Sequence, residues 1–430
     1  MVSIILATAP IHGHVSAYLP IARHLVARGD RVRFVTGSRF AEAVAATGAT
    51  HVALPPESDF DDRMDVNSTY PERRSLRGAA AIAFDVETFF VRPGRGQYDT
   101  LTRAIATEPA QVVVADPTFI GAAHLVRLPA RERPGVLVGS PLPLPLGSRD
   151  TAPYGMGLAP APFLNSVRNR ALQQLTDRLL RKANDLADRH HHDIVGRPYG
   201  RPIMDWLPLA DAIAQFTIAE FEYPRSDAPA HLHFVGPLLG HSVPTPEPDW
   251  WHELDGSRPV VHVTQGTIAN KDFSQLVGPA LEGLAGEDVL VVVSTGDRPL
   301  ESLPTLPANA RVARYLSYAD LLPKTDAFVT NGGYGGVQLA LRHGVPIVVT
   351  GGQEDKPEVG ARVAWTGVGI RFKDVSPSPQ ALRTAVRKVL TDGSYRRAAR
   401  QMSDRMAQAP GMHGLAAIIE DLASARTTAR

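Results

Sequence analysis

The chain has 430 residues, which is enough for two domains of ordinary size with a core each. Its 45 Lys and Arg residues balance its 44 Asp and Glu residues, which argues against nucleic acid or an anionic membrane as partner. The absence of cysteine excludes disulfides and thiolate chemistry. No apolar run approaches the roughly 20 residues of a transmembrane helix, and the apolar N-terminus breaks at Pro10 without a basic leader. We expect a soluble, globular, cytoplasmic protein, monomeric or homodimeric.

The N-terminal half alternates short apolar runs with helical patterns. Runs rich in Val and Ile predict strands buried on both faces at residues 3–7, 32–36, 112–115 and 136–139. Between the first two runs, residues 17–28 place apolar side chains on one helical face and stop at Gly29. A strand, a helix and a strand within about 30 residues form a βαβ unit, which predicts a doubly wound parallel sheet.

The C-terminal half repeats this pattern. Its predicted strands are 260–264, 289–294, 311–316, 327–330 and 345–349, and its predicted helices include 273–284, 336–342 and 357–365. Prolines at alternate positions, Pro244, Pro246 and Pro248, favour an extended linker between the halves. We therefore expect an N-terminal domain (1–230), a linker (231–255), a C-terminal domain (256–410) and a terminal helical segment (411–430).

The most specific motif lies in residues 327–360. An apolar strand runs into four glycines that open a helix: Gly332, Gly333, Gly335 and Gly336. Glycine lets the backbone approach a ligand closely, and the free N–H groups of a helix N-terminus suit a diphosphate. A second strand then delivers Asp355 to the same carboxyl edge, where ligands of open α/β sheets bind. A phosphate-binding turn at one end and a carboxylate at the other predict a site for a nucleotide-linked sugar.

This stretch resembles the donor-binding signature of GT-B nucleotide-sugar glycosyltransferases, in particular their bacterial macrolide and antibiotic branch. The positions that match at unbroken spacing are Phe328, Val329, Thr330, Gly332, Gly333, Gly335, Gly344, Val345, Pro346 and Asp355. Asn331, Gly336 and Lys356 depart from the family's His, Ser and Gln. The resemblance implies two Rossmann-like domains facing across a cleft, with the C-terminal helix (411–430) crossing back to the N-terminal domain. It also implies that backbone N–H groups and Asn331 hold the diphosphate, and that Asp355, with Glu354 and Lys356, holds the sugar.

Sugar transfer to an alcohol needs a base, and a neutral imidazole suits this role. His14 follows the first predicted strand, on the loop before the helix, whose positive end we expect to keep the ring unprotonated. The resemblance implies that Gly13-His14 is the family's catalytic Gly-His pair; the alternative is a loop histidine that fills space. Asp116, after the run 112–114, matches the family's partner carboxylate, and its alternative role is a turn former before Pro117.

The resemblance implies further contacts on both sides. Thr267 matches a hydroxyl near the phosphates, with a turn or helix cap as the alternative. Tyr315 and Tyr318 occupy the Trp and Gln positions of the base-reading stretch, and packing explains both equally well. We expect the acceptor pocket in the N-terminal domain, lined by segments 56–110 and 140–205 and the nearby strand end. Its apolar candidates are Phe84, Phe89, Phe90, Phe119, Leu142, Tyr154, Met156 and Phe163.

Two features bear on metals and cofactors. The histidine run at residues 189–193 does not predict a metal site, because adjacent histidines point to different sides of a helix. It ends the amphipathic segment 165–187, so we interpret it as solvated surface. No Asp-x-Asp follows the strands of the second half. We expect no metal and no cofactor other than a UDP- or TDP-sugar as co-substrate.

These features predict an inverting, metal-independent glycosyltransferase. It would move a sugar from a UDP- or TDP-sugar to a hydroxyl of a hydrophobic small molecule, such as a macrolide, polyketide or flavonoid. His14 would deprotonate that hydroxyl and Asp116 would orient His14. A sugar-nucleotide 2-epimerase of the same fold is one alternative, against which the apolar insertions argue. A catalytically inactive helper protein is the other, and it has no use for His14 and Asp116.

Overall fold

A parallel sheet of seven strands organises the N-terminal domain, within the residues that the structure describes (1–161, 163–238, 245–267, 270–352 and 354–428). In this computed structural model the strand order is β3-β2-β1-β4-β5-β6-β7, and all neighbours are parallel. The strands are β1 (Ser3–Ala7), β2 (Arg31–Thr36), β3 (Thr50–Ala53), β4 (Val112–Ala115), β5 (Gly135–Ser140), β6 (Ala212–Gln215) and β7 (Leu232–Phe234).

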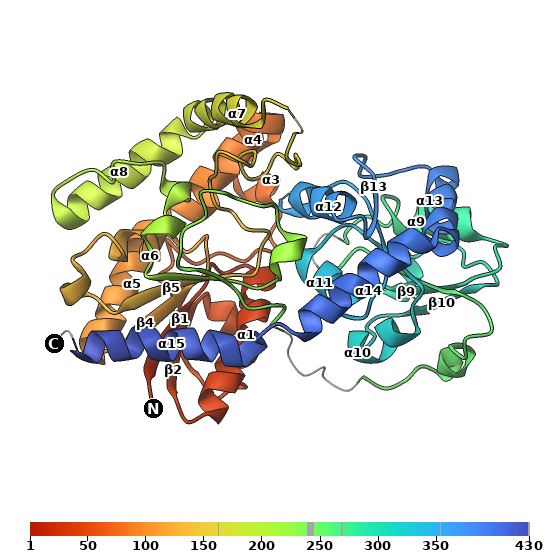
Figure 1. Cartoon of the computed structure of the whole chain (residues 1–430), viewed down its shortest axis with the longest axis horizontal. Coiled ribbons are helices and arrows are strands. Elements are labelled where there is room, and N and C mark those ends of the chain that lie inside the picture. The colour runs from red at the N-terminus through yellow and green to blue at the C-terminus, as the bar shows by residue number, and fades with distance from the viewer. Residues whose placement is uncertain (162, 239–244, 268–269, 353, 429–430) are drawn as a thin grey trace.

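Successive side chains of these strands enter two cores, one on each face of the sheet. Val113 packs with one core and Val112 with the other, which is why β4 is apolar throughout. Helices α5, α6 and α8 cover the first core, and α1, α2 and α15 cover the second (Figure 1). The helices before residue 200 are α1 (His12–Ala27), α2 (Ala41–Ala45), α3 (Val66–Thr69), α4 (Gly78–Asp85), α5 (Gly94–Thr107), α6 (Ile120–Leu125), α7 (Asn165–Leu179) and α8 (Arg181–Val195).

The C-terminal domain is built on a second parallel sheet of six strands in the order β10-β9-β8-β11-β12-β13. Its strands are β8 (Val260–Thr264), β9 (Leu290–Ser294), β10 (Ala310–Ala313), β11 (Ala327–Thr330), β12 (Ile347–Val349) and β13 (Gly369–Arg371). Its helices are α9 (Val277–Leu284), α10 (Tyr318–Leu321), α11 (Tyr334–Arg342), α12 (Lys356–Trp365), α13 (Pro379–Thr391) and α14 (Gly393–Ala407). The first strand of each domain thus lies inside its sheet, as the doubly wound pattern predicted.

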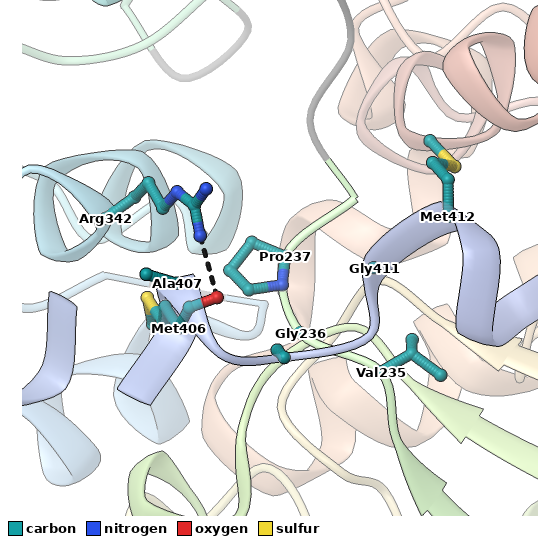
Figure 2. Close-up of a pocket in the computed structure, with 9 residues that line it drawn as sticks. Val235, Gly236, Pro237, Arg342, Met406, Ala407, Gly411 and Met412 are labelled. Atoms are coloured by element: carbon teal, nitrogen blue, oxygen red, sulfur yellow. Dashed lines mark hydrogen bonds between the residues drawn. The ribbon is translucent and has the colours of Figure 1, made fainter. Parts of the chain in front are cut away.

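The chain crosses between the domains twice. It leaves the first sheet after β7 and returns from α14 to α15 (Gly411–Thr428), which runs along the first sheet (Figure 1). The two crossings lie side by side around a cavity of about 210 Å³ (Figure 2). Gly236 has φ +81°, and a Cβ there would lie 2.4 Å from Cβ of Ala409. Glycine is required at this position, because both the backbone conformation and the close approach exclude a side chain.

The fold agrees with the sequence analysis in outline and corrects several details. β1, β4, β8 and β11 have the predicted bounds, but α1 begins at His12 and segment 165–187 forms two helices. The sequence analysis missed β3, β6, β7 and β13, and β7 lies inside the stretch 231–255 that it assigned to the linker. Pro244 lies outside the described residues. Among the described helices, none has the length and apolar character needed to cross a bilayer.

Candidate active site

His14 and Asp116 meet at the carboxyl edge of the first sheet. His14 lies in the first turn of α1, which follows β1, and Asp116 follows β4, the strand beside β1. Nδ1 of His14 lies 3.1 Å from Oδ2 of Asp116, and the two residues are only 7% and 0% exposed. The sequence analysis placed His14 on a loop, which is wrong because α1 starts two residues before it. The position of the His14 ring is therefore set by the helical backbone of α1.

The Asp116 carboxylate is fixed by three more hydrogen bonds. Its Oδ2 accepts from the backbone N–H of Ala9 at 3.0 Å, and its Oδ1 accepts from the N–H and the hydroxyl of Thr118, each at 2.6 Å. An immobile carboxylate on Nδ1 sets the tautomer in which Nε2 is free to accept a proton. The sequence analysis did not identify Thr118, and the Asp-Pro-Thr turn is the signal that would have found it.

The pKa of the His14 imidazole is raised above its ordinary value. Burial of the ring is the largest single effect and lowers this pKa, but the Asp116 carboxylate, together with Asp355 and Glu354, more than offsets it. The sequence predicts that the helix N-terminus keeps the ring unprotonated. The raised pKa runs against this prediction, because the Asp116 carboxylate at 3.1 Å favours the charged ring.

Asp355 of the C-terminal domain lies near the His14–Asp116 pair. It is partly buried after β12 and directly before α12, and it is close enough to His14 for each residue to shift the other's pKa. Burial raises the pKa of Asp355 to about 6; Lys356 opposes this rise and Glu354 adds to it. Lys356 Nζ pairs with Glu354, whose φ of +62° is unusual for a residue other than glycine. The three residues of the predicted sugar site therefore lie together.

The glycine-rich turn opens α11, as the sequence predicted. Gly332 has φ +90°, and an added Cβ would lie 2.8 Å from the Val349 side chain, so this position requires glycine. Gly333 is the N-cap residue of α11, and no atom lies within 4 Å of the place where its Cβ would be. The first N–H groups of a helix have no acceptor within the helix, so this end of α11 can bind an anion.

Asn331 links this turn to the neighbouring strand. Its Nδ2 donates to the carbonyl oxygen of Gln265 at 2.6 Å, which joins the end of β11 to the loop after β8. The same loop carries Thr267, whose side chain is exposed. Asn331 therefore lies beside the glycine-rich turn with one donor already in use, and Thr267 is two residues from Gln265, the hydrogen-bond partner of Asn331.

The two tyrosines of the base-reading stretch differ in exposure. The Tyr318 ring packs edge-on against His262, with centroids 5.2 Å apart, and also against Phe328. Tyr315 is 50% exposed. The structure therefore favours the packing alternative for Tyr318, whereas Tyr315 presents a ring on which a base can stack.

The acceptor candidates before β5 divide into core and surface. Phe119 is fully buried in the core of the first sheet, so the prediction that it contacts the acceptor is wrong: α6 begins at the next residue and turns Phe119 inward. Phe90 is partly buried against the same core. Phe84 and Phe89 form a cluster with Tyr70, with ring centroids 5.9 and 5.6 Å apart, respectively. That cluster is partly buried and stays a candidate acceptor surface.

The candidates after β5 lie on an extended segment and at the start of α7. Leu142 and Met156 are partly buried, and Tyr154 is 38% exposed. Phe163 is 83% exposed, directly before the residue that caps α7. Burial around the Tyr154 hydroxyl, together with Asp355 and Glu358, raises the pKa of that hydroxyl well above its ordinary value. Tyr154 thus approaches the sugar end of the donor site from the opposite domain.

The histidine run on α8 is not solvated surface throughout, which corrects the sequence interpretation. His191 is fully buried, and its Nδ1 lies 3.3 Å from Nδ1 of His124 on α6. The sequence offered no signal for this pairing, because it depends on how α8 packs against α6. Within the described residues, no group of three or more His, Cys, Asp or Glu side chains is arranged to hold a metal ion.

Sequence comparisons find relatives that match nearly the whole chain. Residues 279–422 match the family model described as Erythromycin biosynthesis protein CIII-like, C-terminal domain. The chain is 41% identical over 430 residues to the 4'-demethylrebeccamycin synthase of Lentzea aerocolonigenes, covering 97% of this chain and 99% of that protein. It is 31% identical over 441 residues to UDP-glycosyltransferase 2 of Phaeomoniella chlamydospora, covering 98% and 96%, respectively.

A solved structure extends the likeness to the fold. The glycotransferase of kitacinnamycin superimposes with a TM-score of 0.74 at 22% identity, and the match covers 98% of both chains.

Proposed function

This chain belongs to the GT-B glycosyltransferases of natural-product biosynthesis, and on that premise we propose that it transfers a sugar from a UDP- or TDP-sugar to a hydroxyl of a hydrophobic natural product. The observation that carries the proposal is the buried His14–Asp116 pair, whose ring lies close enough to Asp355 of the donor domain for the two to interact electrostatically. A base on one domain and a sugar-holding carboxylate on the other meet at a single place.

The dyad supplies the base. With Nδ1 turned to Asp116, Nε2 of His14 takes the acceptor's proton while the acceptor oxygen forms a bond to the anomeric carbon. The bond from that carbon to the nucleoside diphosphate breaks, and the diphosphate leaves from the opposite face, so the configuration inverts. Asp116 stabilises the imidazolium that forms, which is the same effect that raises the pKa of His14.

The donor domain receives the leaving group. The N-terminus of α11 and the glycines before it present N–H groups to the diphosphate, and Asn331 and Thr267 lie beside them. This arrangement supports a metal-independent reaction, in which the helix end and hydrogen bonds offset the departing charge. Asp355, with Lys356 and Glu354, is placed to hold the sugar hydroxyls.

The proposal is tested by direct turnover. The protein is incubated with UDP-glucose or TDP-glucose and a panel of macrolide, polyketide and flavonoid acceptors; acceptor masses are followed, and the sugar nucleotide is resolved by chromatography because an epimer has an unchanged mass. We expect an acceptor that gains the mass of one hexose. A 2-epimerase would change the sugar nucleotide without any acceptor, and a helper protein would yield no product and bind no nucleotide. Either of these outcomes would overturn the proposal.

A further inference from the structure

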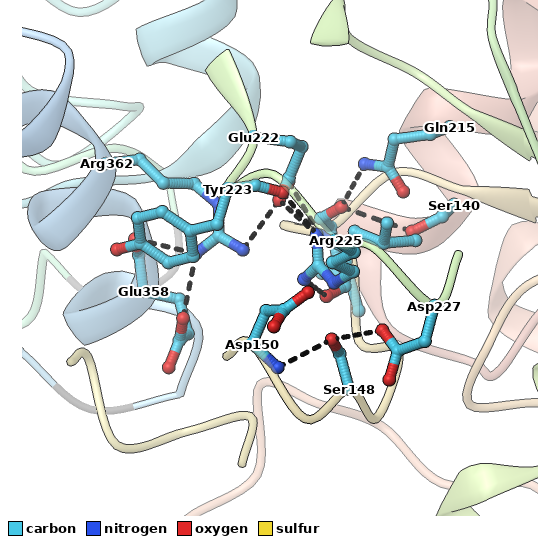
Figure 3. Close-up of polar contacts among 12 residues, drawn as sticks. Ser140, Ser148, Asp150, Gln215, Glu222, Tyr223, Arg225, Asp227, Glu358 and Arg362 are labelled. Atoms are coloured by element: carbon cyan, nitrogen blue, oxygen red, sulfur yellow. Dashed lines mark hydrogen bonds and ion pairs between the residues drawn. The ribbon is translucent and has the colours of Figure 1, made fainter. Parts of the chain in front are cut away.

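A charged network is buried between the two domains (Figure 3). Arg362 of α12 is 1% exposed; its Nη2 donates to Oε2 of Glu222 at 2.7 Å, and its Nη1 donates to Oε2 of Glu358 at 2.8 Å. Arg225 adds a second cation 3.5 Å from Glu222. Glu222 and Arg225 belong to the N-terminal domain, and Glu358 and Arg362 lie on the helix that directly follows Asp355.

The network is accompanied by apolar packing between the domains. Ile218 and Phe221, just before Glu222, already pack in an apolar core of the C-terminal domain with Phe328 and Val337. Buried ion pairs can often be replaced by apolar side chains without loss of stability, because desolvation offsets their attraction. A buried network at this boundary therefore points to a role in orienting groups.

The Glu358 carboxylate also accepts hydrogen bonds from the backbone of a loop. Its Oε1 accepts from the backbone N–H of Gly155 at 3.0 Å and from that of Gly157 at 2.7 Å. Gly155 and Gly157 have φ of +94° and +58°, and a Cβ on Gly157 would lie 2.6 Å from the carbonyl oxygen of Pro357. Arg371 Nη1 donates to the Gly157 carbonyl oxygen at 2.7 Å. The loop backbone is thus seated directly on the first turn of α12.

The same network holds the other end of this loop segment. Glu222 Oε1 accepts from the Leu144 N–H at 2.8 Å, and Arg225 Nη2 donates to the Leu144 carbonyl oxygen at 3.2 Å. One set of charged residues therefore holds residues 144–157 at both ends. One member of this set, Glu358, lies on α12 of the C-terminal domain. Tyr154, next to Gly155, is the residue of this segment whose hydroxyl interacts with Asp355.

We propose that Glu358 is a positioning residue for sugar transfer: by capturing the N–H groups of Gly155 and Gly157, it sets the acceptor-side segment 144–157, with Tyr154, against the sugar end of the donor site. This inference rests on the proposed function. Arg362 orients the Glu358 carboxylate, and Glu222, which is itself paired with Arg225, anchors Arg362 to the N-terminal domain. Segment 144–157, which a bound acceptor would contact, is then positioned relative to the donor site of the C-terminal domain and not only relative to the N-terminal domain.

The kinetic test separates positioning from general stability. Glu358→Ala removes the acceptor of both N–H groups, and Glu358→Asp keeps the charge for Arg362 but withdraws the carboxylate from the loop. Glu220→Ala is the matched control, because Glu220 pairs with Arg405 across the same boundary at 3.6 Å while both side chains are exposed. Each variant is assayed with the best acceptor of the wild type, and UDP and TDP binding are titrated calorimetrically.

We expect kcat/KM for the acceptor to fall about 100-fold in Glu358→Ala and about 10-fold in Glu358→Asp, because a displacement of about 1 Å can have this effect. Nucleotide affinity should stay within about 2-fold, and Glu220→Ala should match the wild type. Equal losses in acceptor turnover and nucleotide affinity would make Glu358 a structural part of the donor domain and overturn the proposal. Unchanged turnover in both variants would also overturn it.

A second measurement does not depend on activity. Amide hydrogen exchange at residues 155–157 should be about 10-fold faster in Glu358→Asp than in the wild type, while the amides of α12 keep their protection. Unchanged exchange would overturn the proposal, and Glu358→Asp decides this even if Glu358→Ala does not fold. If the wild type turns over no acceptor but this exchange differs, the proposed function fails and the loop contact stands.

Discussion

Two buried histidine sites in the N-terminal domain have opposite acid–base behaviour. His14 has a raised pKa, whereas burial and neighbouring cations or imidazoles lower the pKa of His124 to about 3 and that of His191 to about 4. Burial is the largest cause at all three rings, and it lowers the pKa each time. The difference comes from the neighbours: His14 faces the Asp116 carboxylate, and His124 faces His191.

The neighbours distinguish the proposed catalytic histidine, His14, from the two packing histidines. The His14 ring lies at the carboxyl edge of a parallel sheet with a carboxylate on one nitrogen, which is the arrangement that stabilises an imidazolium. The His124 and His191 rings stack, with centroids 5.5 Å apart, between α6 and α8, and they stay neutral at working pH. Burial alone would not distinguish the two sites.

The largest expected effect is at His14. His14→Ala should lower kcat by roughly 10²–10⁴-fold, the usual contribution of a general base, and should lower the free energy of unfolding by roughly 1–3 kcal/mol, because it removes one partner of a buried hydrogen bond. Turnover assays and urea unfolding of the same preparation measure the two quantities. Turnover like that of the wild type would remove His14 from the mechanism.

Asp116→Asn tests whether the carboxylate sets the behaviour of His14. We expect kcat to fall by about 10²-fold, with nucleotide affinity nearly unchanged. In the wild type, kcat/KM should rise with pH as His14 loses its proton, through a pKa above the ordinary value. In the variant this limb should move to lower pH, because burial remains and the charge is gone. A limb that does not move would show that Asp116 is structural.

The His124–His191 pair should act on stability and not on catalysis. The unfolded rings take up protons below about pH 6.5, whereas the folded rings resist protonation down to about pH 3 and 4. Their contribution to the free energy of unfolding is therefore present at pH 7 and is lost as pH falls below 6.5. His124→Gln should remove about 2 kcal/mol of the loss between pH 7 and pH 5.

Urea unfolding at both pH values measures this difference. The control is His233→Gln, at an exposed position on β7, which should leave the pH dependence of stability as in the wild type. A His124→Gln variant with the acid sensitivity of the wild type would mean that the pair does not stay neutral.

The smallest effect is expected at Asn331, the position at which the family has a histidine. Asn331→Ala loses the hydrogen bond to Gln265 and a neutral phosphate donor, so UDP and TDP binding should weaken by about 0.5–1.5 kcal/mol. Asn331→His should be tolerated, because it offers a donor at similar reach. Calorimetric titration of both nucleotides measures this, and no binding to the wild type would overturn the donor site.

The parts of the structure that the sequence predicted are those set by local pattern. β4 and β11 are short apolar runs with the predicted bounds, and Asp116 and Gly332 follow them at the sheet edges where a parallel sheet places its ligands. The failures depend on tertiary packing. Phe119 and His191 are buried by how α6 and α8 pack, and β6, with the sequence AIAQ, resembles a helix as much as a strand. The Glu358 contact joins residues 201 apart or more, and no local pattern encodes it.

The return of α15 has a consequence for synthesis of the protein on the ribosome. Leu415, Ile419 and Ala423 are part of the core on which α1 also packs, and the Gly411 N–H donates to Val235 beside the first sheet. The first domain to emerge therefore lacks part of its own core until residues 415–423 have been translated. Until then, the apolar surface that α15 will cover stays open to chaperones, and a stop codon before residue 411 would leave it open permanently.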